Sequence, residues 1–229
     1  MTGMINPILQ FIELGGPVVA ILLFLSVAAF ALIGLKAIAF FNCKVGMHGN
    51  ADKALALWKQ RNRSQAIGRL KGTKSALGKT LLVSMEQISQ GKTYKEDIED
   101  EVAGVAIREL HELQRGFRTL EAIAQIAPLL GLFGTVLGMI DAFQKLQSAG
   151  NSVDPSILAV GIWVALLTTA AGLAVAMPVS LVLTWFETRL EDERVAIQSM
   201  NADLISTNIS FDQETAGVKQ SEPGVVYAH

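Results

Sequence analysis

Charged residues and cysteine are both scarce in this sequence. Only 17% of its 229 residues are Asp, Glu, Lys or Arg, against about 25% in an average soluble domain. A single cysteine, Cys43, excludes an intrachain disulfide, and His48, His111 and His229 lie too far apart for metal-ligand spacing. The net charge of −2 does not favour nucleic-acid binding. No nucleophile–base pair or phosphate-binding loop is present, so we expect no enzyme, no metal and no cofactor.

What the sequence does contain is long uncharged runs, and 51% of its residues are hydrophobic. Residues 156–186 carry no charged side chain. As a helix this run would extend roughly 46 Å, more than the approximately 30 Å of bilayer hydrocarbon. Residues 14–35 form a second such run, with no preceding Lys or Arg and a length beyond that of a signal peptide core. The sequence therefore predicts an all-α, multi-pass membrane protein.

Polar segments separate the apolar runs and define the expected organisation. Pro17 suits the first turn of a helix, where its missing N–H costs nothing. We expect, in order, an N-terminal periplasmic segment (1–16), a first transmembrane helix (17–40), a cytoplasmic helical domain (41–120), a second transmembrane helix (121–147), a periplasmic loop (148–155), a third transmembrane helix (156–186), and a cytoplasmic tail (187–229) that is disordered toward its end.

The distribution of Lys and Arg predicts the orientation. These residues are concentrated in segment 41–120 and are absent from segments 1–16 and 148–155. Cytoplasmic segments next to membrane helices carry the excess of positive charge. We therefore expect the N-terminus to be periplasmic and the large polar segment and the tail to be cytoplasmic.

The polar segments carry helical patterns of their own. With Gly116 as only a weak interruption, we expect residues 97–120 to continue without a break into the second membrane helix. Residues 77–88 form another amphipathic stretch, ended by Gly91. The third membrane helix is expected to continue through 187–195 and to join these helices, with disorder after Asp212. The apolar positions that predict the first stretch are Ile98, Val102, Val105, Leu110, Leu113, Phe117 and Leu120.

The second and third membrane helices are rich in small and hydroxylated residues. Gly131, Gly134 and Gly138 form a small-residue packing face of the kind that lets membrane helices approach closely. Pro128 precedes that face and frees a backbone carbonyl, which must be satisfied by a neighbour or a water. The third helix offers Gly172, several alanines and Pro178. These residues are the predicted helix-packing positions.

Three threonines are candidates for an ion pathway. Thr135 lies near the middle of the second helix, and Thr168 and Thr169 lie near the middle of the third. If Thr135 and Thr169 face each other, they line a narrow hydrated path. The alternative is that each hydroxyl bonds to a carbonyl of its own helix. The ionisable residues do not distinguish a hydrated path from hydroxyls bonded within their own helix. Asp141 and Lys145, one turn apart, are expected to form a pair at the outer end of the second helix.

Two long motifs resemble one membrane family. Residues 127–140 (APLLGLFGTVLGMI) and 161–178 (GIWVALLTTAAGLAVAMP) are similar to the second- and third-helix signatures of the ExbB/TolQ/MotA proton-channel family, closest to ExbB. The likeness covers nearly the whole chain, with Thr135 and Thr169 at the hydroxyl positions of these signatures. MotA itself is the less similar branch, since it has four membrane helices.

The resemblance implies a homo-oligomeric ring, a pentamer in relatives, in the bacterial inner membrane. The ring would surround a single-helix partner of the ExbD type, whose membrane aspartate carries the proton. The force would pass through a TonB-type protein to outer-membrane transporters. Partners would also include membrane lipids but no nucleic acid.

One residue departs from the family pattern. Val164 occupies the position at which ExbB and TolQ relatives usually carry a glutamate that belongs to the ion pathway. Three possibilities follow from this valine. The ion path consists of hydroxyls and water alone, or its carboxylate comes wholly from the partner subunit, or this chain does not conduct. A TolQ-like subunit of the Tol envelope system and a non-conducting scaffold of the same fold are therefore the alternatives. An unrelated membrane enzyme or transporter subunit is a more distant one.

Overall fold

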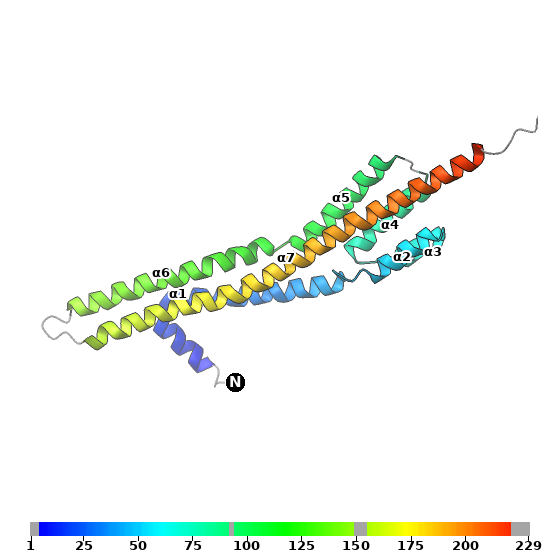
Figure 1. Cartoon of the computed structure of the whole chain (residues 1–229). Coiled ribbons are helices and arrows are strands. Elements are labelled where there is room, and N and C mark those ends of the chain that lie inside the picture. Colours follow the sequence, from blue (N-terminus) through cyan, green and yellow to red (C-terminus); the bar gives the residue numbers. More distant parts are fainter. Residues whose placement is uncertain (1–4, 92–93, 149–154, 221–229) are drawn as a thin grey trace, which may run out of the picture. The chain divides into compact units, whose positions relative to one another are not determined.

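The computed structural model describes the backbone of residues 5–91, 94–148 and 155–220, and these residues form helices joined by short turns (Figure 1). The all-α prediction is confirmed for this part of the chain, which contains no strand. Three helical stretches are long and apolar enough to cross a membrane, as the sequence predicts: Gly16–Asn42, Lys95–Ser148 and Leu158–Ile209. The helices are α1 (Ile5–Asn42), α2 (Gly49–Lys59), α3 (Arg63–Leu70), α4 (Ala76–Ser89), α5 (Lys95–Gln114), α6 (Phe117–Ser148) and α7 (Pro155–Gln220).

The chain divides into two compact units, each with its own contacts. We call the first the membrane unit; it comprises Met1–Ala37 and Arg115–Glu187. The second, the polar unit, comprises Ile38–Gln114 and Thr188–His229. The helix α7 contributes residues to both units.

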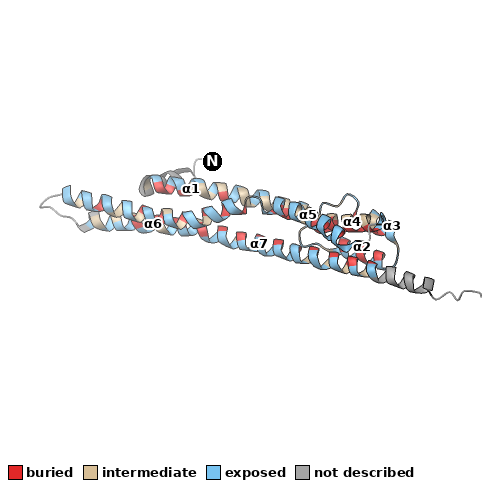
Figure 2. Ribbon diagram, turned by 90° about the horizontal axis from the view of Figure 1, so that it is seen from above, coloured by how far each residue is buried: buried red, intermediate tan, exposed pale blue. Residues whose placement is uncertain are grey.

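The core of the membrane unit is built from three helices. Val18 and Leu22 of α1 pack with Ala127 of α6 and Ala176 of α7. Large apolar side chains also cover the outward faces of the same helices, including Phe24, Phe30, Leu129, Phe133, Trp163, Leu166 and Leu181, where exposed residues predominate (Figure 2). Such a surface is unfavourable in water and suits a helix bundle in lipid or against other membrane helices.

Two glycines with positive φ shape the ends of the membrane helices. Gly16 has φ 63° and interrupts α1 directly before Pro17, where the sequence expects the first membrane helix to start. Gly116 has φ 94° and separates α5 from α6. The predicted continuous helix from 97 into the second membrane helix is therefore wrong. Glycine adopts this backbone conformation without a Cβ penalty, and the break leaves Phe117 buried against Phe186, with 5.9 Å between ring centroids.

The polar unit is organised around the C-terminal half of α7. Lys59 of α2 forms an ion pair with Asp203 at 2.8 Å, and Arg63 of α3 donates to the side chain of Asn208 at 3.1 Å. The prediction that the third membrane helix continues to join the polar helices is confirmed. The stretch predicted at 77–88 is α4, and Gly91, with φ 86°, follows its end. The short helices α2 and α3 were not predicted.

A second polar contact joins α4 to α7 inside this unit. Asn201 donates through Nδ2 to the Thr80 hydroxyl at 3.2 Å, and Ser84 donates to Asn201 Oδ1 at 2.5 Å. All three side chains are buried. Because buried polar groups are costly unless paired, this network selects one register of α4 against α7.

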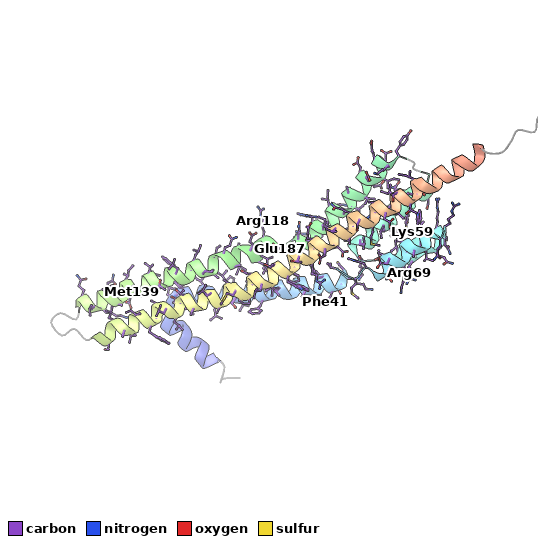
Figure 3. The ribbon with its side chains drawn as sticks, in the orientation of Figure 1. Phe41, Lys59, Arg69, Arg118, Met139 and Glu187 are labelled. Carbon is purple, nitrogen blue, oxygen red and sulfur yellow. The ribbon has the colours of Figure 1, made fainter. Side chains whose placement is uncertain are left out.

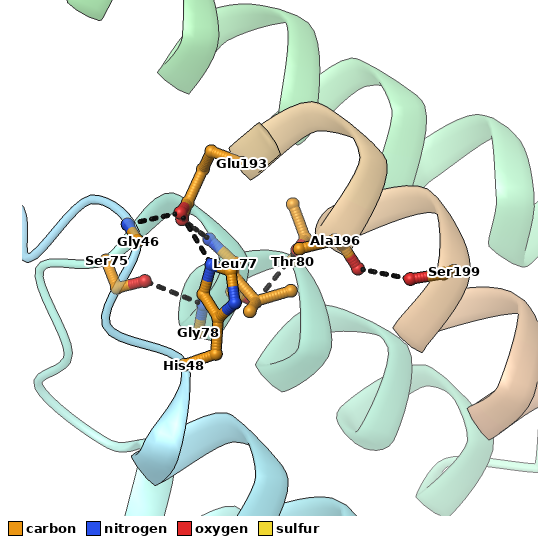
Figure 4. Close-up of polar contacts among 9 residues, drawn as sticks. All are labelled: Gly46, His48, Ser75, Leu77, Gly78, Thr80, Glu193, Ala196 and Ser199. Carbon is orange, nitrogen blue, oxygen red and sulfur yellow. Dashed lines mark hydrogen bonds and ion pairs between the residues drawn. The ribbon is translucent and has the colours of Figure 1, made fainter. Parts of the chain in front are cut away.

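A buried carboxylate, Glu193 of α7, connects three segments of the polar unit (Figure 4). Its side chain is 0% exposed. Its Oε1 accepts from Leu77 N–H at 3.3 Å, in the first turn of α4. Its Oε2 lies 3.0 Å from both the Gly46 N–H, which donates to it, and His48 Nε2. Helix first turns leave N–H groups without helical partners, so Glu193 both satisfies α4 and holds the turn that follows α1.

The end of α7 differs from the sequence expectation. The sequence predicts disorder after Asp212, whereas α7 continues to Gln220. Residues such as Gln213, Glu214 and Ala216 favour helix intrinsically, even without an apolar stripe. The remainder of the predicted disordered tail, residues 221–229, lies outside the described residues.

Candidate ion path between the second and third membrane helices

The glycines predicted as packing positions lie where α6 and α7 cross within one chain. A Cβ added to Gly172 of α7 would lie 2.5 Å from the Ala127 backbone oxygen. One added to Gly131 would lie 2.9 Å from the Thr168 carbonyl oxygen, and one added to Gly138 would lie 3.3 Å from Ala165 Cβ. At Gly172 and Gly131 the two backbones therefore approach so closely that only glycine fits, and at Gly138 the contact is tight. The small-residue faces therefore serve the α6–α7 pair within one chain.

Thr168 and Thr169 converge on one carbonyl across this interface. Thr168 is 2% exposed, and its Oγ1 donates to Ala165 O of its own helix at 2.7 Å. The same hydroxyl lies 3.3 Å from Gly131 O of α6. Thr169 Oγ1 also donates to Gly131 O at 3.3 Å. Gly134 packs directly on the Thr168 side chain.

The expected face-to-face pair of Thr135 and Thr169 is not what the structure brings together. The Thr135 hydroxyl donates to Leu132 O of its own helix at 2.6 Å. Within the described residues no hydrogen bond joins Thr135 to Thr169. The own-backbone alternative therefore describes Thr135, while the contact between α6 and α7 is made by Thr168 and Thr169 with Gly131.

The two membrane prolines do not break their helices. Pro128 lies inside α6 and Pro178 inside α7. A proline frees the carbonyl four residues earlier, here Ala124 and Ala174. Each freed carbonyl is an additional hydrogen-bond acceptor in its helix.

A hollow of about 660 Å³ opens beside the Thr168 end of the interface. Val164, the position of the family glutamate, is half-buried and lines it together with Thr168. At its other end lie Asp141 and Lys145, which form the predicted pair at 2.7 Å and are both largely exposed. The remaining lining residues are Gly16, Pro17, Val18, Gly134, Leu137, Gly138, Ala142, Ser156, Val160 and Gly161.

This arrangement connects a charged, exposed helix end with a buried hydroxyl. From Asp141 to Gly134 is seven residues of α6, about 10 Å at the helical rise. A hollow of this volume has room for several waters, and Thr168, Asp141 and Lys145 supply polar partners for them. Sequence reasoning found each of these residues but did not link them, because only the crossing of α6 and α7 sets Val164 and Thr168 opposite Gly134, Gly138 and Asp141.

Glu193 is the residue with a clear role that sequence reasoning missed. The sequence nevertheless contains a pattern that could have identified it. Phe186, Leu190, Ile197 and Leu204 are buried at helical spacing on α7, and Glu193 falls on the same stripe. An acid on an apolar face indicates either a buried partner or a ligand.

Comparison with known proteins gives one family. A model of the MotA/TolQ/ExbB proton channel family matches residues 72–199. A putative biopolymer transport protein ExbB homolog of Methanothermobacter thermautotrophicus is 39% identical over 108 residues, 47% of this chain and 38% of the relative. Biopolymer transport protein exbB1 of Vibrio cholerae is 42% identical over 86 residues, 37% of this chain and 38% of that protein. The matches thus span less than half the length of these two relatives. Biopolymer transport protein ExbB of Salmonella typhimurium is 26% identical over 192 residues, 80% of this chain and 77% of its own length.

Proposed function

Because the chain belongs to the MotA/TolQ/ExbB proton channel family, we propose that it is the ring-forming subunit of an inner-membrane motor that converts the proton motive force into mechanical work. The observation that carries the proposal is the hollow between α6 and α7, where Thr168 and Val164 lie below the exposed Asp141–Lys145 pair. It offers a polar approach from one membrane face to hydroxyl groups at mid-helix. Passage of one charge across 100 mV releases about 2.3 kcal/mol, enough to bias the position of a partner helix.

The motor needs a carboxylate that this chain does not supply at mid-membrane. With valine at position 164, we propose that the proton is carried by an aspartate on a single-helix partner of the ExbD type. A pentameric ring of this chain would surround that partner, as the family resemblance implies. The subunit contacts would use the exposed apolar faces of α1, α6 and α7, because the glycine faces are occupied inside each chain.

The orientation and the output of the motor are also part of the proposal. We propose that the polar unit lies in the cytoplasm and the N-terminus in the periplasm, which the excess of Lys and Arg in 41–120 supports. The matched relatives named as biopolymer transport proteins favour work delivered through a TonB-type protein to outer-membrane transport. A TolQ-like role in the envelope is the second assignment within the same family.

The Thr→Val substitution tests the path, since valine keeps the shape of threonine and removes its hydroxyl. Proton flux into liposomes containing the chain and its Asp-bearing partner is expected to fall about fivefold for Thr168→Val and for Thr169→Val, the two threonines whose hydroxyls contact Gly131 O across the interface. A fivefold fall is the value of one hydrogen bond of about 1 kcal/mol. Thr184→Val is the matched control, because Thr184 is exposed on α7 and donates to Ser180 O of its own helix. If both path variants conduct like the control, the chain is a scaffold and the hydroxyl path is wrong.

Restoring the family glutamate tests whether the hollow is hydrated. Val164→Glu is expected to assemble and to conduct at least as well as the parent, because Val164 lines the same hollow as Lys145 and the hollow has room for water. Val179→Glu is the matched control. Val179 is buried in α7, and an unpaired carboxylate there costs several kcal/mol. Ring assembly is read by native mass spectrometry in mild detergent; equal loss of assembly in both variants would mean that the hollow is dry.

A further inference from the structure

A cluster of cations surrounds a pocket directly after the first membrane span. The candidate span of α1 ends at Asn42, and Phe41 and Asn42 line this pocket of about 500 Å³ in the polar unit. Lys44, Arg69, Lys71 and Lys74 also line it, and no Asp or Glu does. We call these four residues the basic cluster; Phe41 and Arg69 are labelled in Figure 3.

Within the part of the chain that the structure describes, the four cations have no acidic partner. All four are exposed, and among the described residues none of them forms an ion pair. Other lysines of the same unit do: Lys59 lies 2.8 Å from Asp203 and Lys79 lies 2.7 Å from Glu109. Glu193, the carboxylate that binds this turn, is fully buried and already accepts from Gly46 N–H and Leu77 N–H. The pocket therefore keeps its positive charge available for an external anion.

Lys44, Lys71 and Lys74 lie in two loops that are held in shape without an anion, and Arg69 lies in the last turn of α3. In the first, Lys44 has φ 51°, Val45 N–H donates to Phe40 O at 3.2 Å, and Met47 N–H donates to Lys44 O at 3.0 Å. In the second, between α3 and α4, Thr73 N–H donates to Leu70 O at 3.0 Å and Ser75 N–H donates to Thr73 Oγ1 at 3.3 Å. A preformed site spends little binding free energy on ordering itself.

Two exposed apolar side chains, Phe41 and Met47, line the same pocket as the cations. Phe41 is 79% exposed and Met47 is 68% exposed. Both are unfavourable in water, and both sit within a few residues of Asn42, the last residue of the span. At that depth a bilayer presents phosphodiester headgroups above acyl chains. Basic pockets beside membrane helices suit anionic headgroups.

We propose that the basic cluster is a binding site for an anionic phospholipid, whose phosphodiester sits among Lys44, Arg69, Lys71 and Lys74 while its acyl chains lie against Phe41 and Met47. The exposed Phe41 and Met47 argue for a lipid over a soluble phosphate, since a soluble anion gains nothing from apolar contacts. Such a lipid would fix the height of the first span relative to the membrane surface.

Binding of a short-chain phosphatidylglycerol to the purified full chain in neutral detergent tests the proposal. Native mass spectrometry and lipid titration are expected to show saturable binding of dioctanoyl phosphatidylglycerol and none of dioctanoyl phosphatidylcholine. The variant Arg69→Gln/Lys71→Gln/Lys74→Gln is expected to bind about a hundredfold more weakly, from about fivefold for each cation near a headgroup. Lys74→Gln alone is expected to bind about fivefold more weakly. Because Lys74 lies in a loop, this single variant tests the site even if the triple variant does not fold.

A control variant with the same change in net charge separates a site from general attraction. Lys59→Gln/Lys95→Gln/Arg108→Gln removes three cations of the polar unit that do not line the pocket, and less than a threefold change is expected. Equal weakening by the two triple variants would overturn the proposal. So would displacement of the lipid by millimolar inorganic phosphate or glycerol 3-phosphate, which would instead identify a site for soluble phosphate.

Discussion

Glu193→Ala is expected to lower the free energy of unfolding of the polar unit by about 3 kcal/mol, since it leaves two backbone donors, at Gly46 and Leu77, without their acceptor at a buried site. Each buried unsatisfied group costs about 1–3 kcal/mol. His48 Nε2 also loses its partner. Glu193→Gln keeps one carbonyl oxygen but presents an NH₂ group to the remaining donors. Its free energy of unfolding is expected to lie between those of the parent protein and Glu193→Ala.

The unfolding of this unit can be followed through Trp58. Its side chain is 1% exposed, so its fluorescence changes when the polar unit opens, provided that Trp163 and Trp185 are replaced by Phe. Urea titration in mild detergent then gives the free energy of unfolding. Glu191→Ala is the matched control, because Glu191 is an exposed partner of Arg194 at 3.1 Å, and exposed ion pairs are worth about 0–1 kcal/mol. Equal midpoints for Glu193→Ala and this control would show that the carboxylate does not hold the unit together.

Gly172→Ala is expected to destabilise the α6–α7 pair by about 2–3 kcal/mol, in the range measured for overpacked cores. The added methyl would lie 2.5 Å from the Ala127 backbone oxygen and 3.1 Å from Gly131 Cα. Because both contacts are to backbone, no rotamer change relieves them, and the helices must move apart. That movement also lengthens the Thr168 and Thr169 contacts to Gly131 O and is expected to reduce proton flux.

Gly34→Ala in α1 is the matched control for this substitution. A Cβ at Gly34 meets nothing within 4 Å, and alanine favours a helix over glycine by up to about 1 kcal/mol. The expected result is unchanged or slightly raised stability, measured by SDS titration with far-UV circular dichroism. If Gly172→Ala behaves like Gly34→Ala, the two helices are not packed as closely as the structure has them.

These two substitutions probe features that a ring of subunits would need for different reasons. The glycine crossing sets the shape of the path, because it brings Thr168 to Gly134 and Val164 to the hollow. Glu193 holds the segment after the first span to α4 and α7. The same segment carries Lys44 of the basic cluster. Glu193→Ala, which removes the carboxylate, is therefore expected to weaken lipid binding as well, because the loop that carries Lys44 becomes disordered.

Composition and periodicity alone determined the class of this protein. Uncharged runs as long as a bilayer is thick can be satisfied only as membrane helices, since every backbone group must then bond within the helix. Residues 77–88 and the continuation of the third span past Glu187 also followed from 3.6-residue spacing, which depends on neighbours a few residues away. The motifs at 127–140 and 161–178 were enough to indicate the family.

Tertiary packing decided the rest, because it depends on residues distant in the sequence. Gly116 alone did not reveal a helix break; the burial of Phe117 against Phe186 selects it. Whether Thr169 meets Thr135 or Gly131 depends on the register of α6 against α7, which periodicity within one helix does not contain. Likewise, Glu193 could be recognised as an acid on an apolar stripe, but its partners at Gly46, His48 and Leu77 lie more than a hundred residues away, and only the folded chain brings them to it.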